Sequence, residues 1–496
     1  MFEKMIAFLS ERSGNIRRDL SSLSLVFGTL CVIFLWHFPL LAPDEGRYSE
    51  IPREMLERSD FITPTLNYVK YFEKPPLLYW LNALSFSVFG QNEFAARFPC
   101  ALAGLLTILF TYWLGRELFN RRVGIIAAVI MGASAGFISL ARINLTDMPL
   151  TLCLTVCLGS FILAVRNNGE RKTLYYYLFY AAAAFAVLAK GLIGILFPGA
   201  IIFLFILLRK RWRLLKEMRL FTGILLFFLI AAPWFVLVSM KNPEFARFFF
   251  IHEHFERFLT KVHHRYQPFW FFFAILFAIM LPWSWFIPAA LRDAWQNRKK
   301  EQGETVTWLA IWALFIFAFF TKSNSKLVAY ILPVVPPLAV LIACHFDSAA
   351  ETGRVFRGKF IALAATVTVG VTVIASGFVY AHISGTKTSK TMGLLVKKLA
   401  GPDDMVASFG YDQTFPFYAA RRIVVVDNMG ELEFGSKQGD QSAWFMDKVR
   451  FLNAWESDKK VFVIFSNKEL ERSGKTWKTT PKILSQNAKD VLVTNH

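Results

Sequence analysis

Residues 220–240 read LFTGILLFFLIAAPWFVLVSM, an apolar run without a single charged side chain. A helix needs about 20 such residues to cross the roughly 30 Å hydrocarbon core of a membrane. Basic residues bound this run on both sides, in RKRWRLLKEMR at 209–219 and at Lys241. The stretch therefore predicts one membrane-spanning helix, and the rest of the chain repeats its pattern.

Ten more apolar runs of similar length occur, and none has the alternation of a membrane β-strand. Helices satisfy their own backbone groups in lipid, so the runs predict an all-α polytopic membrane bundle of about eleven transmembrane helices. A hydrophobic content of 55% and only 5 cysteines exclude a disordered chain and a disulfide scaffold. The eleven runs lie near 20–41, 94–115, 123–141, 148–165, 174–189, 191–208, 220–240, 268–291, 305–321, 328–345 and 360–380.

The net charge of +19 could suggest a nucleic-acid partner, but the basic residues follow the membrane pattern. Lys and Arg cluster in the loop after every second crossing, and such loops face the cytoplasm. This predicts a multi-pass membrane protein with a cytoplasmic N-terminus, a C-terminus on the opposite side of the membrane and no nucleic-acid partner. The basic loops lie at 12–18, 116–122, 166–172, 209–219, 298–300 and 354–359.

Two domains are predicted. Residues 1–380 form the membrane domain, which includes a long outer loop at 42–93, and residues 381–496 form a small α/β domain on the same outer side. The runs RIVVV at 422–426 and VFVIF at 461–465 have the composition of strands, and charged helix-like stretches separate them.

The outer loops contain the candidate functional residues. Loop 42–93 is far longer than a connector requires, which predicts a functional surface. Asp44 and Glu45 precede a predicted short helix in this loop, with Ile51, Met55 and Leu56 on one face. A second helix is predicted after Pro75 and Pro76. The next outer turn, ARINLTDMP at 141–149, contains Arg142 and Asp147 on the same predicted membrane face as Asp44. We therefore expect the two carboxylates to converge there.

Each of these residues also has a structural interpretation. Asp44 and Asp147 precede helix starts and could be N-caps. Arg142 and Lys74 could extend towards lipid phosphates, and Lys190 could close a tight turn with the glycine that follows it. The histidine-rich outer loop at 241–267 could be a solvated interfacial segment.

Carboxylates gathered with Arg and Lys at the outer interface favour a group-transfer enzyme that uses a lipid phosphate. Such an enzyme needs cations to hold the phosphate and carboxylates to handle the other reactant. A proton-coupled transporter would place its acids near the bilayer midplane, where these spans have almost none. The residues alone favour a lipid-linked transferase and leave a transporter as the alternative.

Several short motifs then resemble one family. DEGRYSEIPREM at 44–55 and YFEKPPLLYWL at 71–81 resemble the first periplasmic loop of bacterial aminoarabinose lipid A transferases, the ArnT-like family. These are C-type glycosyltransferases that use polyprenyl-phosphate sugars, and they are related to the protein O-mannosyltransferases. The resemblance continues through ARINLTDMP at 141–149, AKG at 189–191, EHFERF at 253–258, KLVAYILP at 326–333 and YDQTFPFY at 411–418.

The resemblance implies an inverting integral membrane glycosyltransferase with the C-type glycosyltransferase fold. It would lie in the bacterial inner membrane with its C-terminal domain in the periplasm, and it would have thirteen transmembrane helices where the apolar runs give eleven. It would transfer 4-amino-4-deoxy-L-arabinose from undecaprenyl phosphate to a lipid A phosphate, and the added amino sugar would confer resistance to polymyxin and other cationic peptides. The alternatives are transfer of another lipid-linked sugar to the lipopolysaccharide core, a glycan or a protein, and a lipid flippase or transporter.

The resemblance also implies roles for individual residues. Asp44 would be the principal catalytic carboxylate and Asp147 its partner. No cofactor is required, although some family members hold a structural zinc ion, for which Glu73 and His254 are the matching positions. The implied substrate-binding residues are Arg47, Tyr48, Tyr71, Lys74, Arg142, Lys190 and Tyr330.

Overall fold

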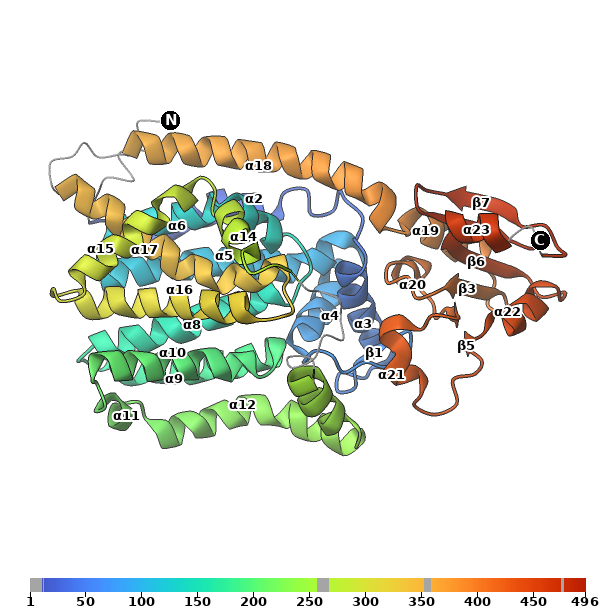
Figure 1. Ribbon diagram of the computed structural model, residues 1–496, viewed down its shortest axis with the longest axis horizontal. Helices are drawn as coiled ribbons and strands as arrows, with labels where there is room; N and C mark the ends of the chain where they lie inside the picture. The colour runs from blue at the N-terminus through green and yellow to red at the C-terminus, as the bar shows by residue number, and fades with distance from the viewer. Residues whose placement is uncertain (1–10, 12, 257–266, 352–357, 474–476) are drawn as a thin grey trace. The chain divides into compact units, whose positions relative to one another are not determined.

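The computed structural model describes residues 11, 13–256, 267–351, 358–473 and 477–496. The chain divides into two compact units (Figure 1). The first, Met1–Ile33 with Pro99–Ala375, we call the membrane unit. The second, Phe34–Phe98 with Ser376–His496, we call the sheet unit. The predicted boundary at 380 lies close to this division, but the predicted outer loop at 42–93 belongs to the sheet unit rather than to the membrane helices.

The membrane unit is helical, as predicted. Its elements are α2 (Ile16–Val32), α5 (Glu93–Leu118), α6 (Arg121–Gly132), α7 (Ala135–Ala141), α8 (Asp147–Arg166), α9 (Arg171–Lys190), α10 (Ile193–Arg209), α11 (Leu214–Glu217), α12 (Leu220–Lys241), η1 (Arg247–Glu256), α14 (Phe271–Ile279), η2 (Trp283–Phe286), α15 (Ile287–Asn297), α16 (Gly303–Lys322), η3 (Val328–Val334), α17 (Val335–Glu351) and α18 (Gly358–Lys387). By sequence, α5 and α18 each have residues in both units.

Ten of the eleven predicted spans coincide with helical structure over most of their length, whereas the predicted span at 20–41 is helical only to Val32, where α2 ends. Within the described ranges, 7 helices are long and apolar enough to cross a membrane, or up to 9 if each bent pair is one span. The bent pairs are α6 with α7, at 69°, and α14 with the helix at 283–297, at 112°. The two remaining predicted spans are α2 and α10, with 17 residues each. The chain is therefore a multi-pass membrane protein whose spans are less uniform than their hydropathy indicates.

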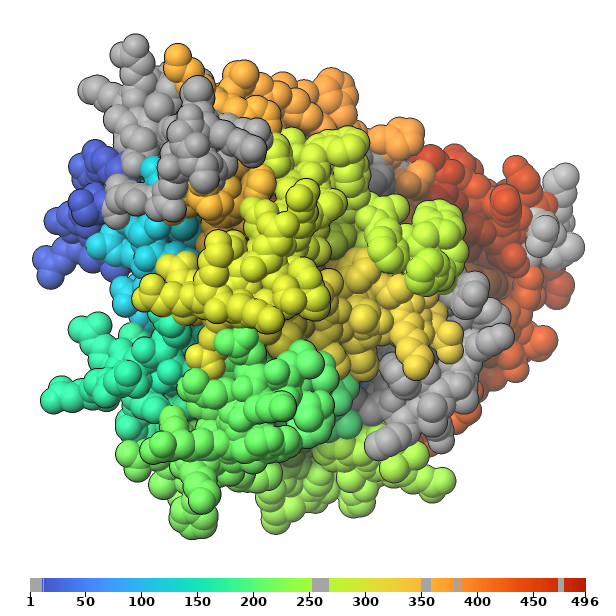
Figure 2. Space-filling model, turned by 60° about the vertical axis from the view of Figure 1, so that its left-hand side comes forward, coloured from blue at the N-terminus to red at the C-terminus, as the bar shows by residue number. Residues whose placement is uncertain are grey.

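Helix pairing in the membrane unit positions two of the predicted site residues. Helices α8 and α9 pack along one another as an antiparallel hairpin, since only a short turn separates them. This pairing places the first residue of α8, Asp147, beside the last residue of α9, Lys190. Figure 2 shows the green surface near residue 200 adjoining the yellow surface near residue 300, and α10 contacts α16.

The sheet unit contains the predicted α/β domain. Its elements are α3 (Asp44–Arg58), β1 (Thr65–Leu66), β2 (Val69–Lys70), α4 (Leu77–Phe89), α19 (Lys390–Leu399), β3 (Met405–Phe409), α20 (Phe415–Ala419), β4 (Val424–Val426), η4 (Gly430–Leu432), α21 (Glu433–Ser436), β5 (Phe445–Met446), α22 (Lys448–Trp455), β6 (Val461–Ser466), α23 (Asn467–Ser473), β7 (Lys482–Gln486) and β8 (Asp490–Thr494). The predicted strands at 422–426 and 461–465 correspond to β4 and β6.

The main sheet has six strands in the order β5-β4-β3-β6-β8-β7. Strands β5, β4, β3 and β6 are parallel, and β8 and β7 pair antiparallel at one edge. The chain leaves β3 towards β4 and β5 on one side and returns to β6 on the other. The order of the parallel strands therefore reverses between β3 and β6.

The predicted helices α3 and α4 are both present, and they pack on the C-terminal part of the sheet unit. Ile51 and Met55, predicted to share one face of α3, are fully buried. The Asn67 side chain exchanges two hydrogen bonds with the backbone of Ile423, at 2.9 and 3.0 Å. At Gly46, an added Cβ would lie 2.5 Å from the carbonyl oxygen of Gln413, so only glycine permits this approach. These contacts explain why the long loop shares a unit with the C-terminal strands.

Candidate active site

The first turn of α3 is held in place by a buried arginine. Arg97 donates two hydrogen bonds of 2.7 Å to the carboxylate of Glu45. It also donates to the backbone carbonyls of Leu35, Phe38 and Pro39 at 2.7 to 2.9 Å. A guanidinium with all its donors used in this way is rigid. The start of α3, where Asp44 and Arg47 lie, is therefore firmly positioned.

Arg47 is the centre of a polar cluster that joins α3 to the C-terminal segment. Its Nε lies 2.5 Å from Oε2 of Glu431, and its NH1 lies 3.5 Å from Oδ1 of Asp44. Glu431 also accepts hydrogen bonds from Tyr71, at 3.2 Å, and from Gln413, at 2.7 Å. Three of these five residues were predicted from the sequence, and the structure brings them together.

Burial sets the electrostatics of this cluster. Loss of solvent raises the pKa of Glu431, and the carboxylate of Glu73 raises it further, although Arg47 acts in the opposite direction. Burial also raises the pKa of Tyr71 well above its ordinary value. Tyr71 therefore stays neutral and remains a hydrogen-bond donor. Arg47 keeps its charge: burial acts to lower its pKa, but the neighbouring Tyr71 and Glu431 raise that pKa above the ordinary value of an arginine.

Asp44 is the accessible carboxylate of the cluster. Its side chain is 38% exposed, against 8% for Arg47 and 12% for Glu431. The alternative that Asp44 is an N-cap is wrong, because the cap position is Pro43 and no side chain makes a cap hydrogen bond there. An exposed carboxylate beside a buried, permanently charged arginine is suited to contact a substrate.

Tyr48 and Lys74 lie in the same unit. The Tyr48 ring is buried and lies 6.2 Å from the ring of Tyr79, so it contributes to a wall of aromatic side chains. Lys74 is half-buried, and its ammonium group donates to the backbone carbonyl of Glu73 at 2.8 Å. That contact directs Lys74 back along its own loop rather than simply outwards into lipid.

A second polar cluster lies in the membrane unit, at the end of the α8 and α9 hairpin. The ammonium of Lys190 forms an ion pair with Oδ1 of Asp147, and both side chains are about nine-tenths buried. The same ammonium lies 4.2 Å from the centre of the Tyr330 ring, within cation–π distance. Three predicted residues from three helices thus meet at one place.

The alternative structural roles of Asp147, Lys190 and Arg142 can each be compared with the structure. Asp147 is not an N-cap, since the cap position of α8 is Thr146 and no side-chain cap bond is present. Lys190 does precede a turn at Gly191, which has a φ of 79°, but the lysine also pairs with Asp147. Arg142 is buried and donates to the backbone carbonyl of Ile33 at 2.5 Å, so it does not extend into lipid.

The two clusters belong to different units, and the predicted convergence of Asp44 and Asp147 stays a prediction. Asp44, Arg47, Tyr48, Tyr71, Glu73 and Lys74 lie in the sheet unit. Arg142, Asp147, Lys190 and Tyr330 lie in the membrane unit.

The predicted zinc position receives little support from the residues present. A structural zinc ion takes four ligands, whereas no group of three or more His, Cys, Asp or Glu side chains in the described part of the chain could hold a metal. His254 lies on η1, and its side chain is outside the described residues. Of the predicted pair, only Glu73 can be placed.

Two residues of the first cluster were not predicted as site residues. Gln413 lies in the YDQTFPFY motif at 411–418, which had already been singled out, so the signal was present but unused. Glu431 has no such signal, because it is one of 36 acidic residues in an ordinary charged stretch. Only the packing of the loop against the C-terminal segment brings it to Arg47.

Two family models match the chain. The model described as dolichyl-phosphate-mannose-protein mannosyltransferase matches residues 73–237, and the model of the aminoarabinose transferase C-terminal domain matches residues 392–495. The first match includes Lys74, Asp147 and Lys190. The second includes Gln413 and Glu431.

Curated relatives carry one name, undecaprenyl phosphate-alpha-4-amino-4-deoxy-L-arabinose arabinosyl transferase. The protein from Edwardsiella ictaluri is 33% identical over 341 residues, which are 66% of this chain and 61% of that protein. The protein from Pseudomonas aeruginosa strain UCBPP-PA14 is 34% identical over 329 residues, which are 66% of this chain and 59% of that protein. The match thus spans about three fifths of the length of these relatives.

Solved structures share the fold. The crystal structure of ArnT from Cupriavidus metallidurans bound to undecaprenyl phosphate superposes with a TM-score of 0.82 at 24% identity, covering 96% of this chain and 98% of that one. The archaeal oligosaccharyltransferase AglB from Archaeoglobus fulgidus gives a TM-score of 0.59 at 16% identity, covering 92% and 70%.

Proposed function

Because the chain belongs to the ArnT-like family of aminoarabinose transferases, we propose that it transfers 4-amino-4-deoxy-L-arabinose from undecaprenyl phosphate to a lipid A phosphate. The reaction would take place at the periplasmic face of the bacterial inner membrane. The observation that carries the proposal is the cluster in which exposed Asp44 adjoins Arg47, fixed by Glu431. It combines an accessible carboxylate with a permanent cation in the stretch DEGRYSEIPREM at 44–55.

The donor requires cations at its phosphate. Transfer forms a bond from an acceptor oxygen to the anomeric carbon and breaks the bond from that carbon to the carrier phosphate, whose oxygen keeps the electron pair. Lys74 and Arg47 would neutralise the growing negative charge. Tyr71, kept neutral by burial, would retain its hydrogen bond to Glu431 and so help to hold the partner of Arg47 in place. Displacement in a single step inverts the configuration at the anomeric carbon.

Asp44 would act on the sugar rather than on the carrier. A lipid A phosphate is already anionic, so no general base is needed to activate it. The carboxylate would instead stabilise positive charge that develops at the anomeric carbon, or hold the ammonium group of the amino sugar. With a hydroxyl acceptor, the same group would remove the proton as a general base.

The cluster of Asp147, Lys190 and Tyr330 would position the donor from the membrane side. A nine-tenths buried lysine keeps its charge only with a partner, and here it has both a carboxylate and an aromatic ring. Tyr48 in the sheet unit and Arg142 in the membrane unit would each contribute a substrate contact. No metal or other cofactor is assigned a step, because the chain supplies its own cations.

The test is transfer by the purified full-length protein with defined lipids. Undecaprenyl-phosphate aminoarabinose and lipid A are incubated with the protein, and the lipid A mass is measured. We expect the mass to increase by one aminoarabinose residue. A product only with a different lipid-linked sugar or acceptor would move the activity to a sister transferase. Other polyprenyl-phosphate sugars and other acceptors are tested in the same way. If none of these lipids gives a product, a flippase or transporter would be favoured.

A further inference from the structure

The sheet unit contains a cavity of about 720 Å³ that the reaction above does not use. Its wall includes Ala42 and Pro43, which directly precede the catalytic candidate Asp44, and Gln413, which hydrogen-bonds Glu431. The cavity therefore borders the Arg47 cluster at two points. A volume of this size is typical of a ligand pocket.

The topology of the sheet places this cavity where α/β proteins bind ligands. In an open parallel sheet, ligands bind outside the carboxyl ends of the strands at the point where strand order reverses. That point here lies between β3 and β6. The segment after β3 supplies Asp412 and Gln413, and the end of β6 with the segment after it supplies Ser466, Asn467 and Lys468. All five line the cavity.

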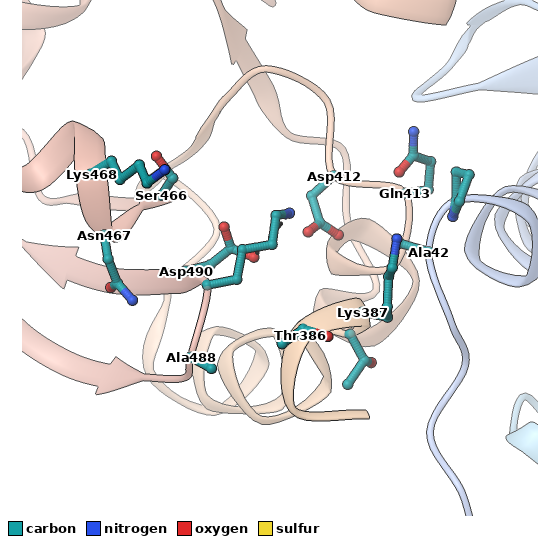
Figure 3. A pocket seen from close by; sticks show the side chains of 13 residues that line it. Ala42, Thr386, Lys387, Asp412, Gln413, Ser466, Asn467, Lys468, Ala488 and Asp490 are labelled. Carbon is teal, nitrogen blue, oxygen red and sulfur yellow. Dashed lines mark ion pairs between the residues drawn. The ribbon is translucent and has the colours of Figure 1, made fainter. Parts of the chain in front are cut away.

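The charges around the cavity favour an anionic, polyhydroxylated ligand. Lys387 and Lys468 both line it, and neither forms an ion pair with any residue that the structure describes. Figure 3 shows Lys468 and Ser466 on one side, Lys387 and Gln413 on the other, and Asp412 and Asp490 between them. Two such ammonium groups can bind a phosphate, while the carboxylates and hydroxyls can bind sugar hydroxyls.

The floor of the cavity is preorganised. Asp412 accepts hydrogen bonds from the Ser389 hydroxyl, at 2.7 Å, and from the Thr414 amide, at 2.9 Å. Asp490 is mostly buried and lies 3.3 Å from the ammonium of Lys489. Asn467 is fixed by hydrogen bonds to the backbone of Asn487 and from the side chain of Gln486. These groups keep their positions without a ligand, whereas the two lysines remain available.

We propose that this cavity binds a phosphorylated saccharide through Lys387 and Lys468. Resting on the proposed function, its occupant is the sugar-phosphate head group of the acceptor lipid, held beside the start of α3 so that an acceptor oxygen can reach the site at Asp44. The same chemistry is present in a free sugar phosphate, and the experiment separates the two sources.

The first arm of the test measures binding without catalysis. The full-length protein is treated with a trace amount of an amine-acetylating reagent, and the rate of acetylation of each lysine side chain is measured by mass spectrometry. Glucosamine 1-phosphate is the soluble probe, and inorganic phosphate and glucosamine are compared with it. We expect the rates at Lys387 and Lys468 to fall about fivefold at about four times the Kd of the probe. Rates at exposed Lys437 and Lys478 should not change.

Each other result of this arm overturns the proposal. Equal protection by inorganic phosphate would show a simple anion site, and absence of protection by glucosamine 1-phosphate would show that the cavity does not bind this chemistry. Neither result depends on transfer activity, so this arm remains decisive even if the proposed function fails.

The second arm separates the lipid from the free sugar phosphate. A Lys387→Ala, Lys468→Ala double variant is compared with Lys437→Ala in the transfer assay with lipid A. We expect the KM for lipid A to rise about tenfold or more, with little change in kcat or in the KM for the donor. An unchanged KM for lipid A, together with protection by the soluble probe, would reject the acceptor lipid as the occupant.

Discussion

The polar clusters of the two units differ in how their charges are paired. In the membrane unit, Lys190 and Asp147 lie at the facing ends of one helical hairpin, and each is the other's ion-pair partner. In the sheet unit, Arg47 pairs with Glu431, a residue from the far C-terminal segment, and this leaves Asp44 accessible. One cluster is closed and local, and the other is open and assembled across the chain.

This difference predicts which cluster contains the reactive group and which one positions a substrate. A buried ion pair can position the helices or a substrate beside it. Its two charges neutralise one another, however, so neither is available to take part in the reaction. A cation already committed to a buried glutamate can orient a second, exposed carboxylate without neutralising it fully. We therefore expect the reactive group in the sheet unit and a positioning role in the membrane unit, and four experiments test this division.

The largest effect is expected for Asp44→Asn. The amide has nearly the same shape as the carboxylate but no charge, so the transfer rate should fall about 10³-fold, within the range of a lost catalytic carboxylate. Folding should be unchanged, because Asp44 is exposed and Arg47 keeps Glu431 as its partner. The rate is measured with purified protein and defined lipids, and the melting temperature is measured on the same samples.

Glu433→Gln is the matched control, since it removes a carboxylate that is 67% exposed in the same unit. It should transfer at the rate of the unmodified protein. An Asp44→Asn protein with an unchanged rate would end the catalytic assignment and, with it, the division between the two clusters.

The second experiment concerns the closed pair in the membrane unit. Lys190→Met and Asp147→Asn each leave one buried partner without the other, which costs about 3 to 5 kcal/mol. We expect each single variant to melt at a lower temperature and to transfer about 100-fold more slowly, because the positioning of the donor is lost.

The double variant separates stability from function. With both charges removed, the melting temperature should recover most of its loss, because no uncompensated charge remains. The transfer rate should stay low if Lys190 positions the donor. Recovery of both quantities together would mean that the pair is only structural.

The same contrast explains which features could be predicted. The spans and helices α3 and α4 follow from local patterns of apolar residues and prolines, and the structure confirms them. The pair of Lys190 and Asp147 is local as well, since its two helices are adjacent in sequence. Residues of this kind are accessible to sequence reasoning because short-range geometry positions them.

Glu431 illustrates what sequence reasoning misses. Its role depends on the packing of residues 34–98 against the C-terminal strands, and the close approach at Gly46 is one of the contacts that makes this possible. No periodicity in the sequence reports such a contact. The predicted assignment of loop 42–93 to the membrane domain has the same cause, since hydropathy identifies the flanking spans but not the partner of a long polar loop.

A smaller effect, on stability, is expected from Glu54, which lies on the buried face of α3 beside the hairpin of β1 and β2. Burial and the neighbouring Glu50 raise the pKa of Glu54 to about 8. One of its oxygens accepts from the Thr65 hydroxyl and the Tyr68 amide, at 2.6 and 3.0 Å. Between about pH 4.5 and 8 the unfolded chain loses this proton while the folded unit keeps it. The free energy of unfolding should therefore fall as pH rises through this interval.

Glu54→Gln should remove this contribution, since the amide oxygen can accept both hydrogen bonds and does not titrate. We expect the variant to gain melting temperature relative to the unmodified protein as pH rises from 5 to 8, by a few degrees. Asp458→Asn, at an exposed position, should follow the unmodified protein throughout. Parallel curves for Glu54→Gln and the unmodified protein would contradict the buried, protonated carboxyl.

The smallest effect is expected from metal removal, which tests whether the open cluster supplies its own positive charge. Arg47 stays protonated in its buried position, and Lys74 lies in the same loop, so the leaving phosphate has two cations available. Incubation with EDTA followed by gel filtration should change the transfer rate by less than about twofold, whereas Lys74→Met should lower it about 100-fold. The metal content is measured in parallel by mass spectrometry. A rate that falls with EDTA and returns only with zinc would place an essential metal at the site, and the cationic role of Arg47 and Lys74 would have to be given up.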